Sequence, residues 1–181
     1  MELKIHTEKG IILVQNINHD GLNKAIVQDK IQQMLQQYFE VADEITIHHT
    51  AKGKPFLDAS LKHFISVSHC AGWIALYISD KEDAGVDIEV EKEAIQKVKN
   101  TYVNQEETDI FKSFSISYLH LIWGAKEAVY KLLGGKIKNL QQEITVTSID
   151  YRNKILHVSV NEKVVPCYFR VLEEEVYLVY C

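Results

Sequence analysis

The sequence predicts an α+β fold in which mostly antiparallel strands are flanked by helices, arranged as two halves of similar layout. Short alternating apolar and polar runs, separated by turn residues, recur in both halves and are typical of antiparallel strands. Apolar residues at three- and four-residue steps predict amphipathic helices over about 21–39 and 117–133. Strands, a helix and a hairpin precede Asp80, whereas a strand, helices and a meander follow it. We therefore divide the chain into residues 1–80 and 81–181.

In the first half we expect strands, one helix and one turn-rich segment. The predicted strands are Leu3 to His6, Ile11 to Gln15, Ile45 to His49, Phe64 to His69 and Trp73 to Ser79. Lys9-Gly10 and residues 70–72 supply the two hairpin turns, and the helix lies between them. Gly53 and Pro55 favour turns over residues 51–57.

In the second half we expect a strand at Ala84 to Val90, followed by helices and a meander. Residues 91–102 predict a short helix and a loop. Asn104, with Glu107 three residues later, is typical of a helix N-cap, so a helix should run from there to about Lys112. Gly134-Gly135 should end the helix that begins near Ser117. The meander strands are Ile144 to Asp150, Ile155 to Val160, Val164 to Val171 and Glu175 to Cys181.

Composition excludes several classes of protein. The 181 residues are 46% apolar and 25% charged, as in ordinary globular domains. The net charge of -5 argues against a nucleic-acid partner, which would require a basic surface. Three cysteines without CxxC spacing predict neither a disulfide framework nor a zinc site. With no signal pattern and no apolar run long enough to span a bilayer, we expect a cytoplasmic protein without a membrane partner.

Asp87 and Glu89 form an unusual acidic pair within an apolar, β-branched run. On a strand they would face the same side, about 7 Å apart, with Val86, Ile88 and Val90 on the other side. Two buried carboxylates at that spacing favour a cation between them, and oxygen ligands suit Mg²⁺. The alternative is a half-exposed strand whose outer face is simply acidic.

Glu127 and Lys131 form the second candidate pair. Being four residues apart, they should lie one above the other on the helix face opposite its apolar stripe. Such pairs are common on exposed helices, where they contribute only about 0.2–0.5 kcal/mol. Taken alone, the pair is therefore better explained as part of a solvated helix surface.

Four short motifs, in this order, resemble those of the 4′-phosphopantetheinyl transferases, and among these the two-half, surfactin-synthetase-type branch. They are Gly53-Lys54-Pro55, Ser66-Val67-Ser68-His69, Gly85-Val86-Asp87-Ile88-Glu89 and Trp123 to Lys131. Each motif is weak singly, but the four together over about 80 residues are specific. The resemblance implies two similar α/β halves packed as a pseudo-dimer within one chain, and hence a monomer.

The resemblance also implies a reaction and its participants. The phosphopantetheine arm of coenzyme A would be transferred to a serine of an apo acyl or peptidyl carrier protein, releasing adenosine 3′,5′-bisphosphate. Asp87, Glu89 and Glu127 would bind Mg²⁺, with Glu127 taking the serine proton directly or through a metal-bound water. Lys131 would balance or protonate the departing phosphate. Trp123 is expected to have a packing role.

The same resemblance assigns contacts to coenzyme A. His69 and Lys126 would contact phosphates, Ser68 would lie beside His69, and Lys54 and Pro55 would border the adenine. The alternatives are a structural histidine at position 69 and plain turn residues at Gly53 and Pro55.

The N-terminal half departs from the family pattern because it contains no arginine, and arginines there often hold the 3′-phosphate. The candidates for binding this phosphate are Lys24, Lys30 and Lys52, and the sequence does not decide among them. A carrier protein is acidic, so a basic and apolar patch is expected to dock it. The candidates for this patch are Lys92, Lys97, Lys99, Lys112, Phe111 and Phe114. The sequence does not identify the carrier.

Two other functions use the same residues. A magnesium-dependent nuclease or phosphohydrolase would use Asp87 and Glu89 as metal ligands, with a lysine to activate water. An inactive relative would bind coenzyme A or a carrier protein without reaction.

Overall fold

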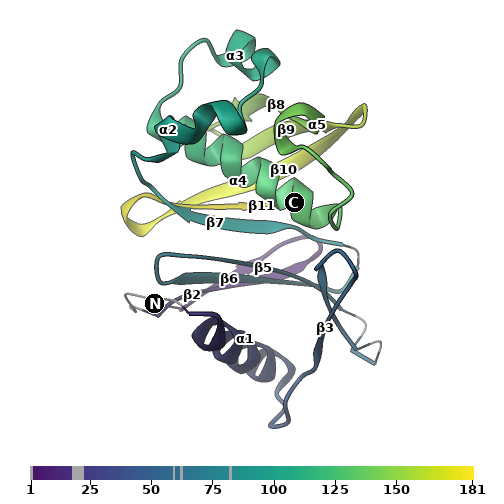
Figure 1. Cartoon of the computed structure of the whole chain (residues 1–181). Helices are drawn as coiled ribbons and strands as arrows, with labels where there is room; N and C mark the ends of the chain where they lie inside the picture. The colour runs from purple at the N-terminus through teal and green to yellow at the C-terminus, as the bar shows by residue number, and fades with distance from the viewer. Residues whose placement is uncertain (1, 18–22, 59, 62, 82) are drawn as a thin grey trace.

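The computed structural model describes residues 2–17, 23–58, 60–61, 63–81 and 83–181. It has a mixed α+β fold with two antiparallel sheets lying between helices (Figure 1). None of the helices in these ranges combines the length and apolar character needed to cross a membrane. The predicted α+β class, with mostly antiparallel strands and flanking helices, is confirmed. The pseudo-dimeric relation of the two halves stays a prediction.

The first sheet has the strand order β1-β2-β6-β5-β4-β3, and all its pairs are antiparallel. Its strands are β1 (Glu2–His6), β2 (Gly10–Asn16), β3 (Ile47–His49), β4 (Pro55–Leu57), β5 (Phe64–Cys70) and β6 (Trp73–Ser79). The predicted hairpins β1-β2 and β5-β6 are confirmed. Strand β4 lies in the segment where only turns were predicted, since Pro55 is tolerated at the start of a strand.

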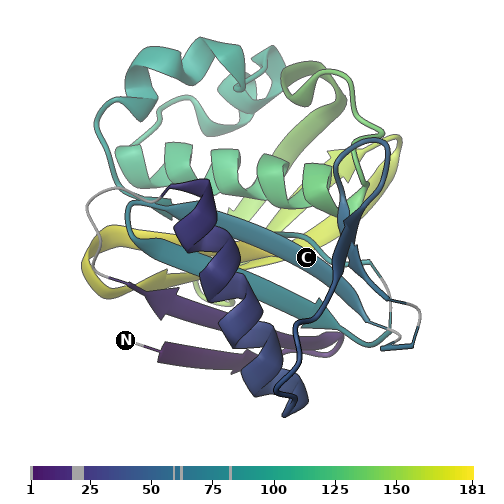
Figure 2. The same ribbon diagram turned by 60° about the horizontal axis from the view of Figure 1, so that its bottom comes forward.

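Helix α1 (Lys24–Phe39) covers one face of this sheet, as Figure 2 shows. Its first turn is capped by the side chain of Asn23, which accepts a hydrogen bond of 3.0 Å from the backbone N–H of Ile26. Its buried residues are Val27, Ile31, Met34 and Leu35, which belong to the apolar stripe read from the sequence. The predicted helix also included residues 21 and 22, which lie outside the described residues.

The second sheet has the strand order β7-β11-β10-β9-β8, again antiparallel throughout. Its strands are β7 (Val86–Val90), β8 (Ile144–Asp150), β9 (Ile155–Val160), β10 (Lys163–Leu172) and β11 (Val176–Tyr180). The acidic strand β7 is therefore an edge strand. It pairs with β11, the last strand of the chain, in a register that places Asp87 opposite Val179.

Helices cover the outer face of the second sheet. They are α2 (Ile95–Val98), α3 (Gln105–Phe111), α4 (Ile116–Leu132) and α5 (Leu140–Glu143), with 3-10 turns at Lys99–Thr101 and Glu173–Glu175. The predicted Asn104 and Glu107 capping box of α3 is present, and Gly134-Gly135 follows α4 in the left-handed conformation. Helix α5, a single turn, was not predicted.

Three apolar cores hold these layers together. One lies between α1 and the first sheet, and a second lies between the second sheet and α4. The third joins the inner faces of the two sheets, where Ile12 and Tyr77 of the first sheet lie in one cluster with Val86 and Ile88 of β7. Because Val86 and Ile88 are completely buried in this third core, the intervening Asp87 must face away from it.

Candidate active site

Strands β5 and β7 belong to different sheets, but they run beside each other and are joined through side chains. The Ser66 hydroxyl accepts a hydrogen bond of 3.1 Å from the Val86 backbone N–H. Two residues further, the Ser68 hydroxyl donates to Asp87 Oδ1 at 2.8 Å. Cys70 Sγ lies 3.5 Å from Glu89 Oε2 and donates to it. One polar face of β5 thus lines the acidic strand, and we call this junction the β5-β7 seam.

Asp87 is the most buried carboxylate of the seam, with an exposed fraction of 3%. Its Oδ1 atom accepts hydrogen bonds from Ser68 and, at 2.7 Å, from the Lys131 ammonium of α4. Its Oδ2 atom is buried and has no hydrogen-bond partner among the described residues. Burial raises the pKa of Asp87, and Lys131 and Ser68 oppose that rise by stabilising the charged form.

Glu89 is half-buried, and each of its two carboxylate oxygens is held by one side chain. The Trp123 indole N–H donates to its Oε1 at 3.2 Å, and Cys70 holds its Oε2. Burial, followed by repulsion from Asp87, raises the pKa of Glu89. Trp123 also packs edge-on against Tyr102, with ring centroids 5.2 Å apart, so the expected packing role is accompanied by an orienting hydrogen bond.

Glu127 faces the same carboxylates from α4. It is half-buried, and within the described part of the chain its side chain accepts no hydrogen bond. Burial is the main cause that raises its pKa. Repulsion from Asp87 and Glu89 adds to the rise, and Lys131 opposes it. The helix therefore brings Glu127 and Lys131 to the acidic face of β7.

This proximity depends on glycines where α4 contacts β7 and the neighbouring strand β11. A Cβ atom at Gly85 would lie 1.9 Å from the Ala128 carbonyl oxygen, and one at Gly124 would lie 2.9 Å from Val179 Cγ2. The first contact is with backbone and cannot be relieved by rotating a side chain. Glycine at both positions lets α4 lie directly on β7 and β11.

We expect Gly85→Ala to destabilise the protein by at least about 1–3 kcal/mol, because the methyl group would push α4 away from β7. The same displacement should separate Glu127 and Lys131 from Asp87. Urea unfolding followed by circular dichroism measures the loss. An unchanged unfolding midpoint would show that the contact tolerates a side chain.

Glu127→Gln should stabilise the ligand-free protein near neutral pH, since it removes a negative charge that Asp87 and Glu89 repel. A carboxyl whose pKa is raised by folding costs stability above its folded pKa, and that cost disappears below its unfolded pKa. The gain should therefore be complete at pH 8 and shrink as the pH falls toward the ordinary range of a glutamate. Thermal unfolding of both proteins across this range measures the difference. A gain that grows on acidification would contradict the assigned direction.

Two hollows adjoin the seam. A cavity of about 190 Å³ lies between the 52–55 loop and the C-terminal end of α4, and Lys52, Lys54, Ser66 and Lys131 are among the residues that line it. A larger groove of about 1110 Å³ lies between α1 and the first sheet, with His69 in its wall. Pro55 and Val67 line both hollows, so the two are neighbours.

The loop lysines are bound to the end of α4. Lys52 Nζ donates to the Gly135 carbonyl at 3.1 Å, and Lys54 Nζ donates to the Leu132 carbonyl at 3.0 Å. Lys54 also forms an ion pair of 2.7 Å with Asp83. Carbonyls at a helix C-terminus attract cations, so these contacts connect the first half of the chain to α4. Figure 2 shows the β3-β4 loop reaching the end of α4.

The predicted site residues thus fall into three groups. The structure brings Asp87, Glu89, Glu127 and Lys131 together with Ser68 at the seam. It places Lys54 and Pro55 at the neighbouring cavity and the exposed His69 in the groove. Of the three lysines considered for the 3′-phosphate, Lys52 alone lines this cavity, while Lys24 and Lys30 lie on α1.

Lys126 requires a correction. Its side chain is completely buried, and its ammonium forms an ion pair of 3.0 Å with the equally buried Glu107 and donates to the Tyr102 carbonyl at 2.7 Å. A lysine enclosed in this way cannot contact a phosphate bound at the seam or in the neighbouring cavity. Its role is structural, as an anchor of α4 to α3.

Sequence reasoning missed Trp123 and Cys70 as neighbours of Glu89. A buried indole N–H needs an acceptor, and Trp123 precedes Glu127 by one helical turn, which was a usable signal. Cys70 carried no comparable signal, because its contact depends on how the two sheets are placed.

The seam offers oxygen donors of the kind that suit Mg²⁺. The unpartnered Asp87 Oδ2 fits such a role. Burial, followed by repulsion from Asp87, raises the pKa of both Glu89 and Glu127, and a cation would relieve that repulsion. Within the described ranges, however, no three His, Cys, Asp or Glu side chains form a ready metal cluster. The cation that contacts Asp87 in this structure is Lys131.

Comparison with known proteins gives a match that includes the acidic strand and α4. No curated protein matches the chain. A family model described as the 4′-phosphopantetheinyl transferase superfamily matches residues 83–181, more than half of the chain, and that segment contains β7 and α4. The chain therefore belongs to the 4′-phosphopantetheinyl transferase superfamily.

Proposed function

We propose that the protein transfers the 4′-phosphopantetheine arm of coenzyme A to a serine of an apo acyl or peptidyl carrier protein, releasing adenosine 3′,5′-bisphosphate. One observation carries this proposal. Within the segment that matches the family, three carboxylates and Lys131 meet beside a cavity lined by lysines. Phosphoryl transfer needs such electrostatic support more than it needs covalent chemistry.

We propose that the transfer depends on Mg²⁺ and that Asp87, Glu89 and Glu127 would bind this ion. Asp87 would use its free Oδ2, and Glu89 is already oriented by Trp123. When bound, the ion would neutralise the pyrophosphate of coenzyme A.

Glu127 is the proposed general base. Its raised pKa brings its proton affinity closer to that needed at neutral pH, and its side chain is not engaged in a hydrogen bond with the rest of the described chain. It would accept the proton of the carrier serine as the oxygen attacks phosphorus. Lys131 would balance the charge that develops on the departing phosphate.

Coenzyme A is elongated, and the cavity and groove that share Pro55 suit an elongated ligand. Lys54 and Pro55 would border the adenine, and Ser68 and His69 would lie along the phosphates. Lys52 is our choice for the 3′-phosphate, since it lines the cavity beside Lys54. The positive loop would also attract an anionic ligand toward the seam.

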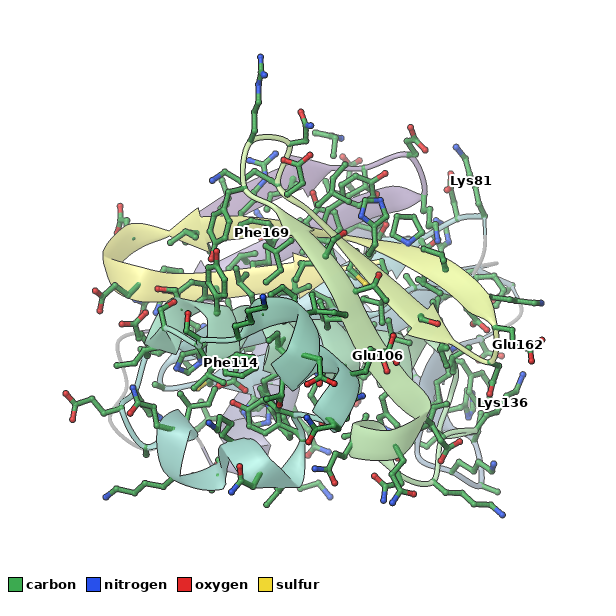
Figure 3. All side chains as sticks on the ribbon, turned by 90° about the horizontal axis from the view of Figure 1, so that it is seen from above. Lys81, Glu106, Phe114, Lys136, Glu162 and Phe169 are labelled. Atoms are coloured by element: carbon green, nitrogen blue, oxygen red, sulfur yellow. The ribbon has the colours of Figure 1, made fainter. Side chains whose placement is uncertain are left out.

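The carrier protein would dock near α2 and α3. There the Lys99 ammonium lies 5.4 Å from the centre of the Phe114 ring, and the rings of Phe111 and Phe114 are 6.1 Å apart. Figure 3 shows Phe114 on this side of the molecule. A mixed basic and aromatic patch suits an acidic partner.

From the resemblance to the two-half, surfactin-synthetase-type branch, in which both halves lie in one chain, we also propose a monomer. We assign the reaction to the cytoplasm, as expected from the cysteine usage.

Product analysis tests the proposal against its rivals. The protein is incubated with coenzyme A, Mg²⁺ and each of several apo carrier proteins, and adenosine 3′,5′-bisphosphate is measured by chromatography. We expect it only when coenzyme A and an apo carrier are both present. Its formation without a carrier, or cleavage of added nucleic acid, would favour a hydrolase. Coenzyme A binding without product across the panel would favour an inactive relative.

A further inference from the structure

Among the described residues, Lys131 supplies the positive charge that contacts Asp87 Oδ1. Its ammonium is 2.7 Å from that oxygen and 3.0 Å from the Val86 carbonyl oxygen. Asp87 has 4% of its side chain exposed, against 25% for Lys131. The carboxylate is therefore fixed in the seam, whereas the lysine reaches it from a more open position at the end of α4.

The same residue, Lys131, lines the cavity next to the seam, together with Lys52 and Lys54. Lys131 therefore has two possible anionic partners, namely Asp87 and a phosphate in that cavity. A lysine side chain carries a compact ammonium charge at the end of a flexible four-carbon chain. It can therefore exchange partners without a movement of the backbone. Asp87 cannot exchange, because β7 is held in the ladder with β11.

We propose that Lys131 acts as an internal substitute for the metal ion, neutralising Asp87 while the site is empty and leaving it for a phosphate when Mg²⁺ and coenzyme A bind. This inference rests on the proposed function and adds to it a positioning role for Lys131 in the empty protein. Three carboxylates lie close together at the seam, and the Lys131 ammonium is in contact with one of them, Asp87. The ion pair keeps Asp87, the most buried of the three, from being an unpaired buried charge.

Because an ammonium and a metal ion repel each other, Lys131 should compete with Mg²⁺ for Asp87. Metal binding by the protein alone should therefore be weaker than the three carboxylates would allow. Any anion that draws Lys131 into the cavity should strengthen it.

The test measures Mg²⁺ affinity by calorimetry, and Mn²⁺ affinity by electron paramagnetic resonance, without coenzyme A or carrier. We expect Lys131→Met to lower the Kd for both ions by at least about ten-fold. Lys131→Arg keeps the charge and should bind within about two-fold of the wild type. Lys136→Met removes the same charge from the exposed turn after α4 (Figure 3) and should also stay within about two-fold, because solvent screens it.

A second measurement applies if Lys131→Met folds poorly. Lys131→Gln retains a hydrogen-bond donor without the charge, and its affinity should also rise about ten-fold. In addition, the melting temperature of the metal-free Lys131→Gln protein should fall, and saturating Mg²⁺ should raise it by more than in the wild type.

Each outcome separates the two ideas. If metal affinity is unchanged or weaker in both neutral variants while the wild type transfers normally, the proposed role of Lys131 as a substitute for the metal ion is overturned. The proposed function then still stands. No metal binding by the wild type together with no transfer overturns both. Tighter metal binding in the neutral variants supports the proposed role of Lys131, whether or not a carrier protein has been found.

Discussion

Asp87→Asn should reduce the rate of phosphopantetheine transfer by at least about 100-fold while the protein remains folded. Asparagine has the same shape, so its side-chain oxygen can still accept the 2.8 Å hydrogen bond from Ser68. It removes the charge that Lys131 neutralises and the free oxygen proposed as a metal ligand. The effect should thus fall on the chemistry more than on the fold.

Steady-state rates with saturating coenzyme A and carrier measure this loss, and circular dichroism checks the fold. Glu162→Gln is the matched control, since it neutralises an exposed carboxylate in the β9-β10 turn (Figure 3). It should retain the wild-type rate. Full activity of Asp87→Asn would mean that the metal and the acidic strand are wrongly assigned.

Glu107→Ala should have the largest effect on stability, a loss of about 3–5 kcal/mol in the free energy of unfolding. Glu107 and Lys126 both have completely buried side chains, and the ion pair between them is 3.0 Å long. Glu107 also accepts backbone hydrogen bonds of 2.9 Å from Asn104 and 2.8 Å from Val146. Alanine would leave the Lys126 ammonium buried without its counter-ion.

Urea unfolding measures the change, with the neighbouring Glu106→Ala as control. Glu106 is exposed on the same helical turn (Figure 3), so its loss should stay within about 0.5 kcal/mol. Adding Lys126→Met to Glu107→Ala should recover part of the stability, because the unpaired charge is then gone. If the double variant is no more stable than Glu107→Ala, the buried charge is not the cause of the loss.

Local patterns predicted most of the secondary structure. Both amphipathic helices and the C-terminal meander follow from periodicity, and the Asn104 cap follows from a rule that involves residues only three apart. Elements of one or two turns or a few residues, such as α5 and β4, escaped because so short a stretch has no clear period.

The site was only partly predictable, for a geometric reason. Residues 126 and 127 are neighbours in the chain, but successive helical residues point about 100° apart. Glu127 therefore reaches the seam, while Lys126 enters the core toward Glu107. Which of the two lysines of the motif meets Asp87 depends on how α4 lies across β7.

The contact between the two sheets is likewise a tertiary property. Ser66, Ser68 and Cys70 alternate along β5 and so share one face of it, but nothing local shows that this face meets β7. The seam follows from packing Val86 and Ile88 against the first sheet, which turns Asp87 toward α4.

The intact mass of an apo carrier protein, recorded before and after incubation with the protein, coenzyme A and Mg²⁺, tests the central claim most directly. We expect the carrier to gain the mass of one phosphopantetheine arm, and a carrier whose acceptor serine is replaced by alanine to gain none. The Asp87→Asn protein should leave the carrier unmodified over the same time. If no apo carrier in a broad panel gains this mass although coenzyme A binds, the protein is not a phosphopantetheinyl transferase.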